Sequence, residues 1–560
     1  MPGCHPVTAV YEDTSLSQPS QPSPTSRQAS SFQHLLQAFS QPLHNATFTG
    51  ILRGLEKESL RVLPDGTLAQ TDHPLALGSA LKHPHITTDY SEALLEFITE
   101  PFRHIAELLQ QLEDIHRFTC QQLDQQGERL WPASMPCLLG SDDQIPVARY
   151  GNSNSGTMKT IYRIGLGHRY GRSMQTIAGI HYNFSLPNEF WLALQQEEGN
   201  QLSLQDYKTQ RYFALIRNFR RYFWLLIYLF GASPAVCSSF VKGRAHQLQA
   251  FDEQAKSLYT PYATSLRMGD LGYQSDAQQS LIVCYNNLPS YLKTLYGAIS
   301  TTHPAYEAVG LMDAQGRYQQ LNTSLLQIEN EFYSSIRPKH PAQSGETALQ
   351  ALRLRGVEYV EVRCIDLNPY EPLGITAEQM HVMDAFLLFC LLHDSPLTGS
   401  EEYREGQDNQ KRVVYYGRDP DLTLIRNRET ISMRRWAEDI LAGTAECAAL
   451  LDQANGGTQY QQAVAQQSLK VQHPELTPSA RILQDMRTEQ KTFFGHTMAL
   501  AEQHRQYFAS HPLDADKEAY YQRLAQRSLT EQQELEATPQ LPFAAYLDNY
   551  YAQYRCCVNN

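Results

Sequence analysis

The sequence predicts an α+β protein in which a few strands with one polar face come before a long helical part. Strand patterns occur at 179–187 and 359–366, where polar and apolar side chains alternate, and at 52–62, which a turn signal closes. Apolar residues recur at helical spacing over 105–115, and helical periodicity dominates beyond about residue 375. No repeat of fixed period is visible.

The composition is that of a large acidic chain. Its 560 residues suit either several domains or one large domain with insertions. A net charge of −13 argues against a broad phosphate-binding surface, so we expect no nucleic-acid partner. The ten cysteines form no CxxC pair, which argues against a zinc ribbon or a disulfide-stapled secreted scaffold. The strongest apolar run, 223–230, is far shorter than the roughly 20 residues that span a bilayer, so we expect no membrane partner and a cytoplasmic location.

The chain opens with a segment that lacks the means to fold. Residues 15–31 contain Ser, Pro and Gln with almost no apolar side chains, so they cannot bury enough surface to offset the entropy of ordering. We therefore expect 1–31 to be a disordered leader. Helical apolar spacing begins at 32–39.

The strand at 52–62 carries the first pair of acids. Glu56 and Glu58 are two residues apart, so a strand places both carboxylates on one face, about 6–7 Å apart. Taken alone, such a pair is more often a solvated face than a metal site.

Two more acids stand in the largely apolar segment 85–99, whose ends favour strands although Thr88 and Asp89 also suit a helix start. If Asp89 and Glu96 are buried, each must be paired, hydrogen-bonded or bound to a metal, because an isolated buried charge is too costly. The alternative is that one of the two acids caps a helix or lies in an exposed position.

Two further segments have polar faces. The glycine-bounded loop 151–156 could hold a phosphate through backbone N–H groups, although it matches neither a Walker A nor a dinucleotide motif. The strand at 179–187 presents His181 and Asn183 opposite an aromatic face, which suits the wall of a site, although a single strand histidine is more often structural.

The remaining candidates lie on both sides of an apolar, aromatic helix predicted at 207–230. Arg267 follows that helix; its planar guanidinium suits a substrate carboxylate, with a surface ion pair as the competing explanation. In 359–366, Glu361 and Arg363 share one strand face, and an acid beside a permanent cation is typical of metal–phosphate sites.

The candidate metal ligands lie on separate segments that could converge: Glu56, Glu58, Asp89, Glu96, His181 and Glu361. Two carboxylates 4 Å apart repel by roughly 4 kcal/mol at an effective dielectric constant of about 20, so such a cluster requires cations. Hard oxygen ligands favour Mg²⁺ or Mn²⁺ over zinc. Spacing along the chain does not establish the convergence.

Together these segments resemble the proteobacterial type of glutamate–cysteine ligase. The resemblance is nearly collinear from about 35 to 540 and rests on the motifs RGLEKESLRV, LGSALKHPHITTDYSEALLEFIT, LWPASMPC, MQTIAGIHYNFSLP, YLFGASPAVCSSF, PYATSLRMGDLGY, LQIENEFY, VEYVEVRCIDLNP and SARIL. It implies a glutamine-synthetase-like fold, in which a curved antiparallel sheet forms an active-site funnel with helices outside. It also implies a single large catalytic domain at 32–545, with 546–560 as a tail.

The implied reaction is the ATP-dependent joining of the glutamate γ-carboxylate to the cysteine amine through γ-glutamyl phosphate, the first step of glutathione synthesis. ATP is then a co-substrate, the partners are small molecules, and we expect a monomer. No second ATP-binding module is visible, so we expect the dipeptide as product. Three other functions stay open: a ligase of the same fold for another amine, a metal-dependent phosphodiesterase that needs no ATP, and a catalytically inactive binding protein.

The resemblance also implies roles for individual residues. The six candidate ligands look like the metal set, Glu56 and Glu361 are also catalytic with Arg363, and Arg363 would contact the transferring phosphoryl group. Weaker candidates for phosphate contact are Arg163, Arg337 and Lys339. Residues similar to a cysteine-side pocket are Tyr90, Tyr162, Leu166, Gln175, Tyr273 and Tyr333, and Arg267 resembles a carboxylate clamp. Tyr90 departs from the expected Phe, which bears on the discrimination of cysteine from its analogues.

Overall fold

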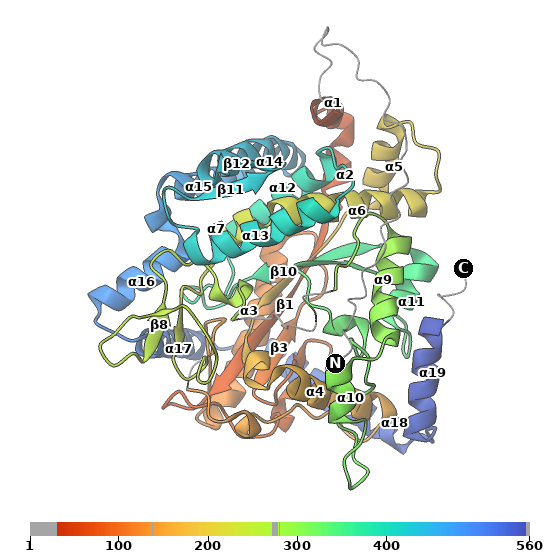
Figure 1. Ribbon diagram of the computed structural model, residues 1–560, viewed down its shortest axis with the longest axis vertical. Coiled ribbons are helices and arrows are strands. Elements are labelled where there is room, and N and C mark those ends of the chain that lie inside the picture. Colours follow the sequence, from red (N-terminus) through yellow and green to blue (C-terminus); the bar gives the residue numbers. More distant parts are fainter. Residues whose placement is uncertain (1–30, 137, 272–277, 279–280, 556–560) are drawn as a thin grey trace, which may run out of the picture.

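One antiparallel sheet contains the three strands that the sequence predicts. The computed structural model, which describes residues 31–136, 138–271, 278 and 281–555, orders the sheet β2-β3-β1-β5-β10-β9, with β4 paired to the end of β1. The strands are β1 (Leu52–Val62), β2 (Ile86–Thr88), β3 (Leu94–Ile98), β4 (Arg129–Leu130), β5 (Ile180–Ser185), β9 (Ile336–Lys339) and β10 (Tyr359–Ile365). Helices surround this sheet, which confirms the α+β class (Figure 1).

The segment 85–99, whose structure the sequence did not decide, forms the two strands β2 and β3. The turn between them is closed by a hydrogen bond of 2.9 Å from the N–H of Asp89 to the carbonyl of Leu94. Both acids of this segment therefore belong to the sheet or to the turn at its end, and Asp89 does not begin a helix.

The register of the sheet brings the polar residues of different strands side by side. Glu56 on β1 lies opposite His181 on β5, and Glu361 on β10 lies opposite Asn183 on β5. Because side chains alternate between the two faces of a strand, these directly opposed residues share one face. The alternation predicted for 179–187 and 359–366 is confirmed.

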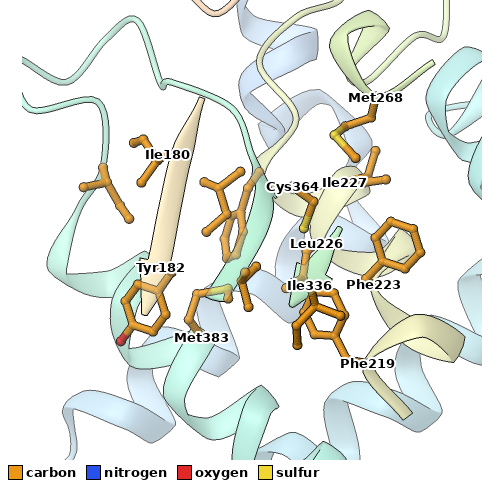
Figure 2. Packing of buried hydrophobic residues seen from close by; sticks show 14 of the residues in the cluster. Ile180, Tyr182, Phe219, Phe223, Leu226, Ile227, Met268, Ile336, Cys364 and Met383 are labelled. Atoms are coloured by element: carbon orange, nitrogen blue, oxygen red, sulfur yellow. The ribbon is translucent and has the colours of Figure 1, made fainter. Parts of the chain in front are cut away.

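The other face of the sheet packs against the aromatic helices. Tyr182, Ile336 and Cys364 point into a cluster that includes Phe219 and Phe223 (Figure 2). The helices involved are α6 (Leu204–Tyr222), α7 (Trp224–Phe230) and α12 (Ala377–Leu392). The single helix predicted at 207–230 is thus two helices that meet at Phe223, and both belong to the core as expected.

Helices make up most of the rest of the described chain. They include α1 (Ser31–Phe39), α2 (Asn45–Phe48), α3 (Ile105–Gln125), α4 (Asn154–Tyr170), α5 (Asn188–Glu197), α9 (Leu288–Ser300), α10 (Pro304–Val309), α11 (Ala348–Arg355), α13 (Ser400–Tyr416), α14 (Met433–Asn455), α15 (Gln459–Gln472), α16 (Pro478–Thr488), α17 (Phe493–Ser510), α18 (Ala515–Ala537) and α19 (Phe543–Arg555). Smaller strands are β6 (Ala235–Cys237), β7 (Gln249–Ala250), β8 (Ser257–Tyr259), β11 (Thr423–Arg426) and β12 (Glu429–Ser432). In the described ranges, no helix has an apolar stretch long enough to cross a membrane.

The C-terminal region differs from the expectation in one respect. The segment 546–560, treated as a tail, begins inside α19, whose described residues end at Arg555. Leu547 and Tyr554 are buried there, so the helix has an apolar face that packs on the domain.

Candidate active site

A cavity of about 470 Å³ opens on the polar face of the sheet. Its walls come from the strands, from α4, from the segments around 330 and 345, and from α19. Among the described residues, the predicted site residues that line it are Glu56, Glu58, Asp89, Tyr90, Glu96, Tyr162, Arg163, Leu166, Gln175, His181, Tyr333, Arg337, Lys339, Glu361 and Arg363. Tyr273 lies outside the described residues. The convergence that spacing alone did not establish is therefore present.

The acids are grouped around His181. The Nδ1 atom of His181 lies 2.9 Å from Glu56 Oε2 and 3.7 Å from Glu361 Oε1, while its Nε2 lies 3.7 Å from Glu58 Oε1. Three side chains, those of Glu56, Glu96 and His181, each offer one ligand atom, and these atoms lie within 4.8 Å of one another. This spacing is compatible with a single cation held by the three side chains.

Burial and neighbouring acids disfavour the ionised forms of two acids in the cluster, Glu58 and Glu96. Burial raises the pKa of Glu58 to about 8, and the neighbouring Asp89 adds to this, although Arg267 and Arg363 oppose it. Burial, followed by the charges of Glu56 and Asp89, also holds the pKa of Glu96 well above its usual range. Since a divalent cation would stabilise the ionised carboxylates, and since most of the ligands are oxygens, the residues fit Mg²⁺ or Mn²⁺.

Glu361 is the acid that lies beside the cations. Its Oε1 is 3.2 Å from Arg363 Nη1 and its Oε2 is 3.6 Å from Lys339 Nζ. Lys339 and Arg363 hold the pKa of Glu361 far below its usual range, although burial alone would raise it. Among the described residues, Glu361 Oε2 and Arg363 Nε are buried without a hydrogen-bond partner, although buried polar atoms usually have one.

The other two arginines predicted to contact phosphate donate hydrogen bonds to backbone carbonyls. Arg337 donates from Nη2 to the carbonyls of Asn330, at 2.9 Å, and Phe332, at 2.5 Å. Arg163 donates to the carbonyls of Asp89 and Lys159. These contacts fix the two side chains, and both residues line the cavity.

Arg267 does not line this cavity. It is buried, its Nη1 lies 3.6 Å from Asp366 Oδ1, and its Nη2 donates to the carbonyl of Arg363 at 3.0 Å. The ion pair is therefore buried, not on the surface as the competing explanation assumed. Arg267 contacts the site through its hydrogen bond to the backbone of Arg363, so its binding of a substrate carboxylate stays a prediction.

The loop 151–156 does not form the phosphate cradle that was one interpretation of its sequence. The N–H of Asn152 donates to Glu536 Oε1 at 2.9 Å, and the N–H of Asn154 donates to Gln540 Oε1 at 2.6 Å. These N–H groups are satisfied by side chains of the C-terminal region, so they are not free to bind a phosphate.

Sequence reasoning missed several residues of the cavity: Lys159, Tyr170, Gln278, Asn330, Glu331, Tyr546 and Tyr550. Glu331 accepts hydrogen bonds from Arg169 at 2.9 Å, Tyr170 at 2.6 Å and the N–H of Gln327 at 2.6 Å. In the sequence, Glu331 could have been recognised as a candidate because it is an acid next to apolar residues in LQIENEFY. Tyr546 and Tyr550 were not predicted as site residues, because they lie in the segment that the sequence analysis treats as a tail.

The chain is similar to known proteins of one family. A family model described as glutamate-cysteine ligase matches residues 36–413. The chain is 52% identical over 513 residues to a glutamate–cysteine ligase of Saccharophagus degradans, covering 91% of this chain and 96% of the relative. A glutamate–cysteine ligase of Pseudomonas aeruginosa is 51% identical over 512 residues, with coverage of 91% and 96%.

Two solved structures are also similar. A glutamate–cysteine ligase of Francisella tularensis in complex with AMP has a TM-score of 0.85 and 36% identity, and the match covers 91% of this chain and 99% of that one. A bifunctional glutathione synthetase of Pasteurella multocida has a TM-score of 0.68 and 26% identity, with coverage of 86% and 55%. The residues matched by the family model include every acid of the cluster.

Proposed function

This chain belongs to the glutamate–cysteine ligase family, and we propose how its cavity carries out that family's reaction, the ATP-dependent joining of the glutamate γ-carboxylate to the cysteine amine. One observation carries the proposal. Acids from four strands or their ends meet cations from β9 and β10 in one cavity, where phosphate groups and the metal ions that accompany them can both be held. We take the polar face of the sheet to be the wall of a glutamine-synthetase-like funnel.

The acid cluster would hold Mg²⁺ or Mn²⁺ through Glu56, Glu58, Asp89, Glu96, His181 and Glu361. When bound, such ions neutralise the phosphate oxygens of ATP. Arg363 and Lys339, which both lie beside Glu361, would hold the γ-phosphoryl group.

The chemistry needs two displacements, because a carboxylate and an amine do not condense unaided in water. A γ-carboxylate oxygen of glutamate attacks the γ-phosphorus of ATP, the bond to the bridging oxygen breaks, and ADP leaves. The cysteine amine then attacks the carbonyl carbon of γ-glutamyl phosphate, phosphate leaves with the electron pair of the C–O bond, and the amine loses a proton. The cavity contributes position and charge neutralisation to both steps.

The amino-acid end of the cavity is lined by Tyr90, Tyr162, Leu166, Gln175 and Tyr333. Aromatic and apolar side chains form most of this wall, which suits a thiol-bearing side chain better than a charged one. We assign it to cysteine, with the glutamate γ-carboxylate between this wall and Arg363.

The intermediate is tested with glutamate labelled with ¹⁸O in the γ-carboxylate. Transfer through γ-glutamyl phosphate moves one labelled oxygen into the phosphate released when cysteine and ATP are present, which mass spectrometry detects. Unlabelled phosphate would exclude the intermediate. Replacing cysteine by a panel of amines in the same assay separates this activity from that of a ligase for another amine.

A further inference from the structure

A second cavity, of about 720 Å³, opens beside α6, a helix that packs on the apolar face of the main sheet. Its walls come from the end of α6, the segment 332–335, the connection 393–398, α13 and the hairpin of β11 and β12. Phe223 and Met268, which Figure 2 labels, both belong to this wall. Tyr333 lines both cavities, but among the described residues no member of the acid cluster lines this one. Its size suits a small organic molecule.

Arginines outnumber acids in the lining of the second cavity, although the chain as a whole is acidic. The arginines are Arg217, Arg220, Arg221, Arg267 and Arg426, and the acids are Asp394, Glu402 and Glu405. Three of the arginines have a carboxylate partner: Arg221 with Glu402, Arg267 with Asp366, and Arg426 with Asp439. In the part of the chain that the structure describes, Arg217 and Arg220 form no ion pair.

Arg217 is a buried cation, only 7% exposed, whose charge is not balanced by an acid among the described residues. It donates from Nη1 to the carbonyl of Asn286 at 2.8 Å. It also donates from Nε to the hydroxyl of Ser395 at 3.2 Å and from Nη2 to the carbonyl of Ser395 at 3.1 Å. Burial, followed by the charge of Arg221, lowers the pKa of Arg217 to about 10. Because an unpaired buried charge is costly, an anion in the cavity would be favourable.

Arg220 presents the guanidinium that can contact such an anion. It lies three residues after Arg217, on the same side of α6. The central carbon of its guanidinium lies 4.5 Å from the ring centre of Tyr285 and 5.5 Å from that of Tyr403. Contacts with ring faces leave the N–H groups in the guanidinium plane able to donate, and no described residue accepts a hydrogen bond from them.

The acids of the cavity do not take this role. Glu402 is paired with Arg221, and Glu405 accepts a hydrogen bond of 2.9 Å from the N–H of Arg428. Asp394 is exposed to solvent. The rest of the wall is rich in aromatic side chains, namely Tyr222, Phe223, Phe332, Tyr333, Tyr403 and Trp436. A ligand that suits this wall has an anionic group and an apolar body.

We propose that the second cavity is a separate ligand site, which binds a small organic carboxylate with an apolar body. Arg220 donates hydrogen bonds to the carboxylate, the charge of Arg217 adds to the attraction, and the aromatic side chains cover the body. The inference does not rest on the proposed function, because the acid cluster takes no part in it.

The test compares two probes of nearly equal shape that differ in charge, phenylacetate and phenylacetamide. Their dissociation constants for the full chain are measured by ligand-observed NMR. We expect phenylacetate to bind about ten-fold more tightly than phenylacetamide, the difference that one charge-assisted hydrogen bond gives. This preference should disappear in Arg220→Gln. Saturating Mg–ATP should leave the binding of phenylacetate unchanged, because the nucleotide belongs to the other cavity.

Two further variants keep the test decisive. Arg404→Gln is the matched control, because Arg404 is an exposed arginine of α13 that does not line the cavity. It removes the same charge and should keep the preference. Arg220→Lys serves if Arg220→Gln unfolds, and it should keep part of the preference because the charge remains without the planar fork.

Four outcomes would overturn the inference. They are equal binding of the two probes by the wild type, an unchanged preference in folded Arg220→Gln, an equal loss in Arg404→Gln, and displacement of phenylacetate by Mg–ATP. Displacement by inorganic phosphate at equal concentration would show a site for any anion and would overturn the assignment to an organic carboxylate. None of these results bears on the ligase reaction, which is measured separately.

Discussion

Glu58 and Glu96 lie directly opposite each other on the antiparallel strands β1 and β3. Like charges in this position destabilise a sheet; here Glu58 is buried, Glu96 is half-buried, and both line the cavity. A cation bound by the two carboxylates would remove this repulsion.

The first prediction concerns the acid beside Arg363. We expect Glu361→Gln to lower kcat by about 10²–10³ or more, because it removes a charge that pairs with Arg363 and that we propose to hold metal. The fold should survive, since the side chains of Lys339 and Arg363, whose ion pairs with Glu361 are lost, are partly exposed to solvent. The control is Glu358→Gln, whose carboxylate binds Lys208 at 2.8 Å and does not line the cavity. Near-normal turnover of Glu361→Gln at saturating Mg–ATP would contradict the role.

The second prediction concerns the repulsion between the acids of the cluster when no metal is bound. Because the pKa of Glu96 is raised in the folded state, its ionised form destabilises the metal-free protein at neutral pH. We expect Glu96→Gln to increase the free energy of unfolding in EDTA by about 1 kcal/mol or more. The stabilisation of the protein by Mg²⁺ should decrease in the same variant. Urea unfolding with EDTA and with Mg²⁺ measures both, and a less stable variant in EDTA would rule out the repulsion.

The third prediction concerns Arg267. Arg267→Met alone leaves Asp366 buried without its cation, which costs about 3–5 kcal/mol of stability. We therefore expect Arg267→Met/Asp366→Asn to be the folded variant in which the clamp role is measured. If Arg267 binds a substrate carboxylate, the KM of glutamate or cysteine rises much more than that of ATP. Asp366→Asn is the control. If the KM values of glutamate and of cysteine are the same in the double variant and in this control, Arg267 does not bind a substrate carboxylate.

The fourth prediction concerns the hydroxyl of Tyr90. This group is buried and has no hydrogen-bond partner among the described residues, and a Cβ at Gly167 would lie 2.5 Å from it. An unsatisfied buried hydroxyl costs about 1–3 kcal/mol, so we expect Tyr90→Phe to stabilise the protein. Urea unfolding measures the change. The ratio of kcat/KM for cysteine and for a larger amine, measured with the same variant, shows whether the hydroxyl also affects selectivity.

The fifth prediction concerns the packing of α4. A Cβ on Gly165 would lie 2.2 Å from Gln327 Oε1, which accepts a hydrogen bond from the N–H of Leu321 at 2.9 Å. We expect Gly165→Ala to destabilise the protein by about 1–3 kcal/mol through overpacking. Gly297→Ala is the matched control, because Gly297 is also inside a helix but meets nothing within 4 Å, and it should stabilise by about 0.5–1 kcal/mol. Thermal unfolding of both variants checks the contrast.

Much of the site could be predicted because alternation along a strand is a local property. Glu361 and Arg363 share a face in any regular strand, and the same holds for Glu56 and Glu58. The strand at 52–62 has the predicted bounds. Collinear motifs then identified the family, which the comparisons confirm.

What the sequence did not determine depends on contacts between distant segments. Nothing local indicates that the N–H groups of Asn152 and Asn154 donate to Glu536 and Gln540, or that Arg267 is buried against Asp366. The same is true of α19, which is held at the cavity by hydrogen bonds from Tyr551 to Gln327 and from Gln553 to Gly345.

The sequence by itself thus determined which side chains share a face and which chemistry they bring. Tertiary structure decided which faces meet. Strand register is set by the packing of whole strands and not by neighbouring residues, so only the folded sheet places Glu58 opposite Glu96 and Glu56 opposite His181.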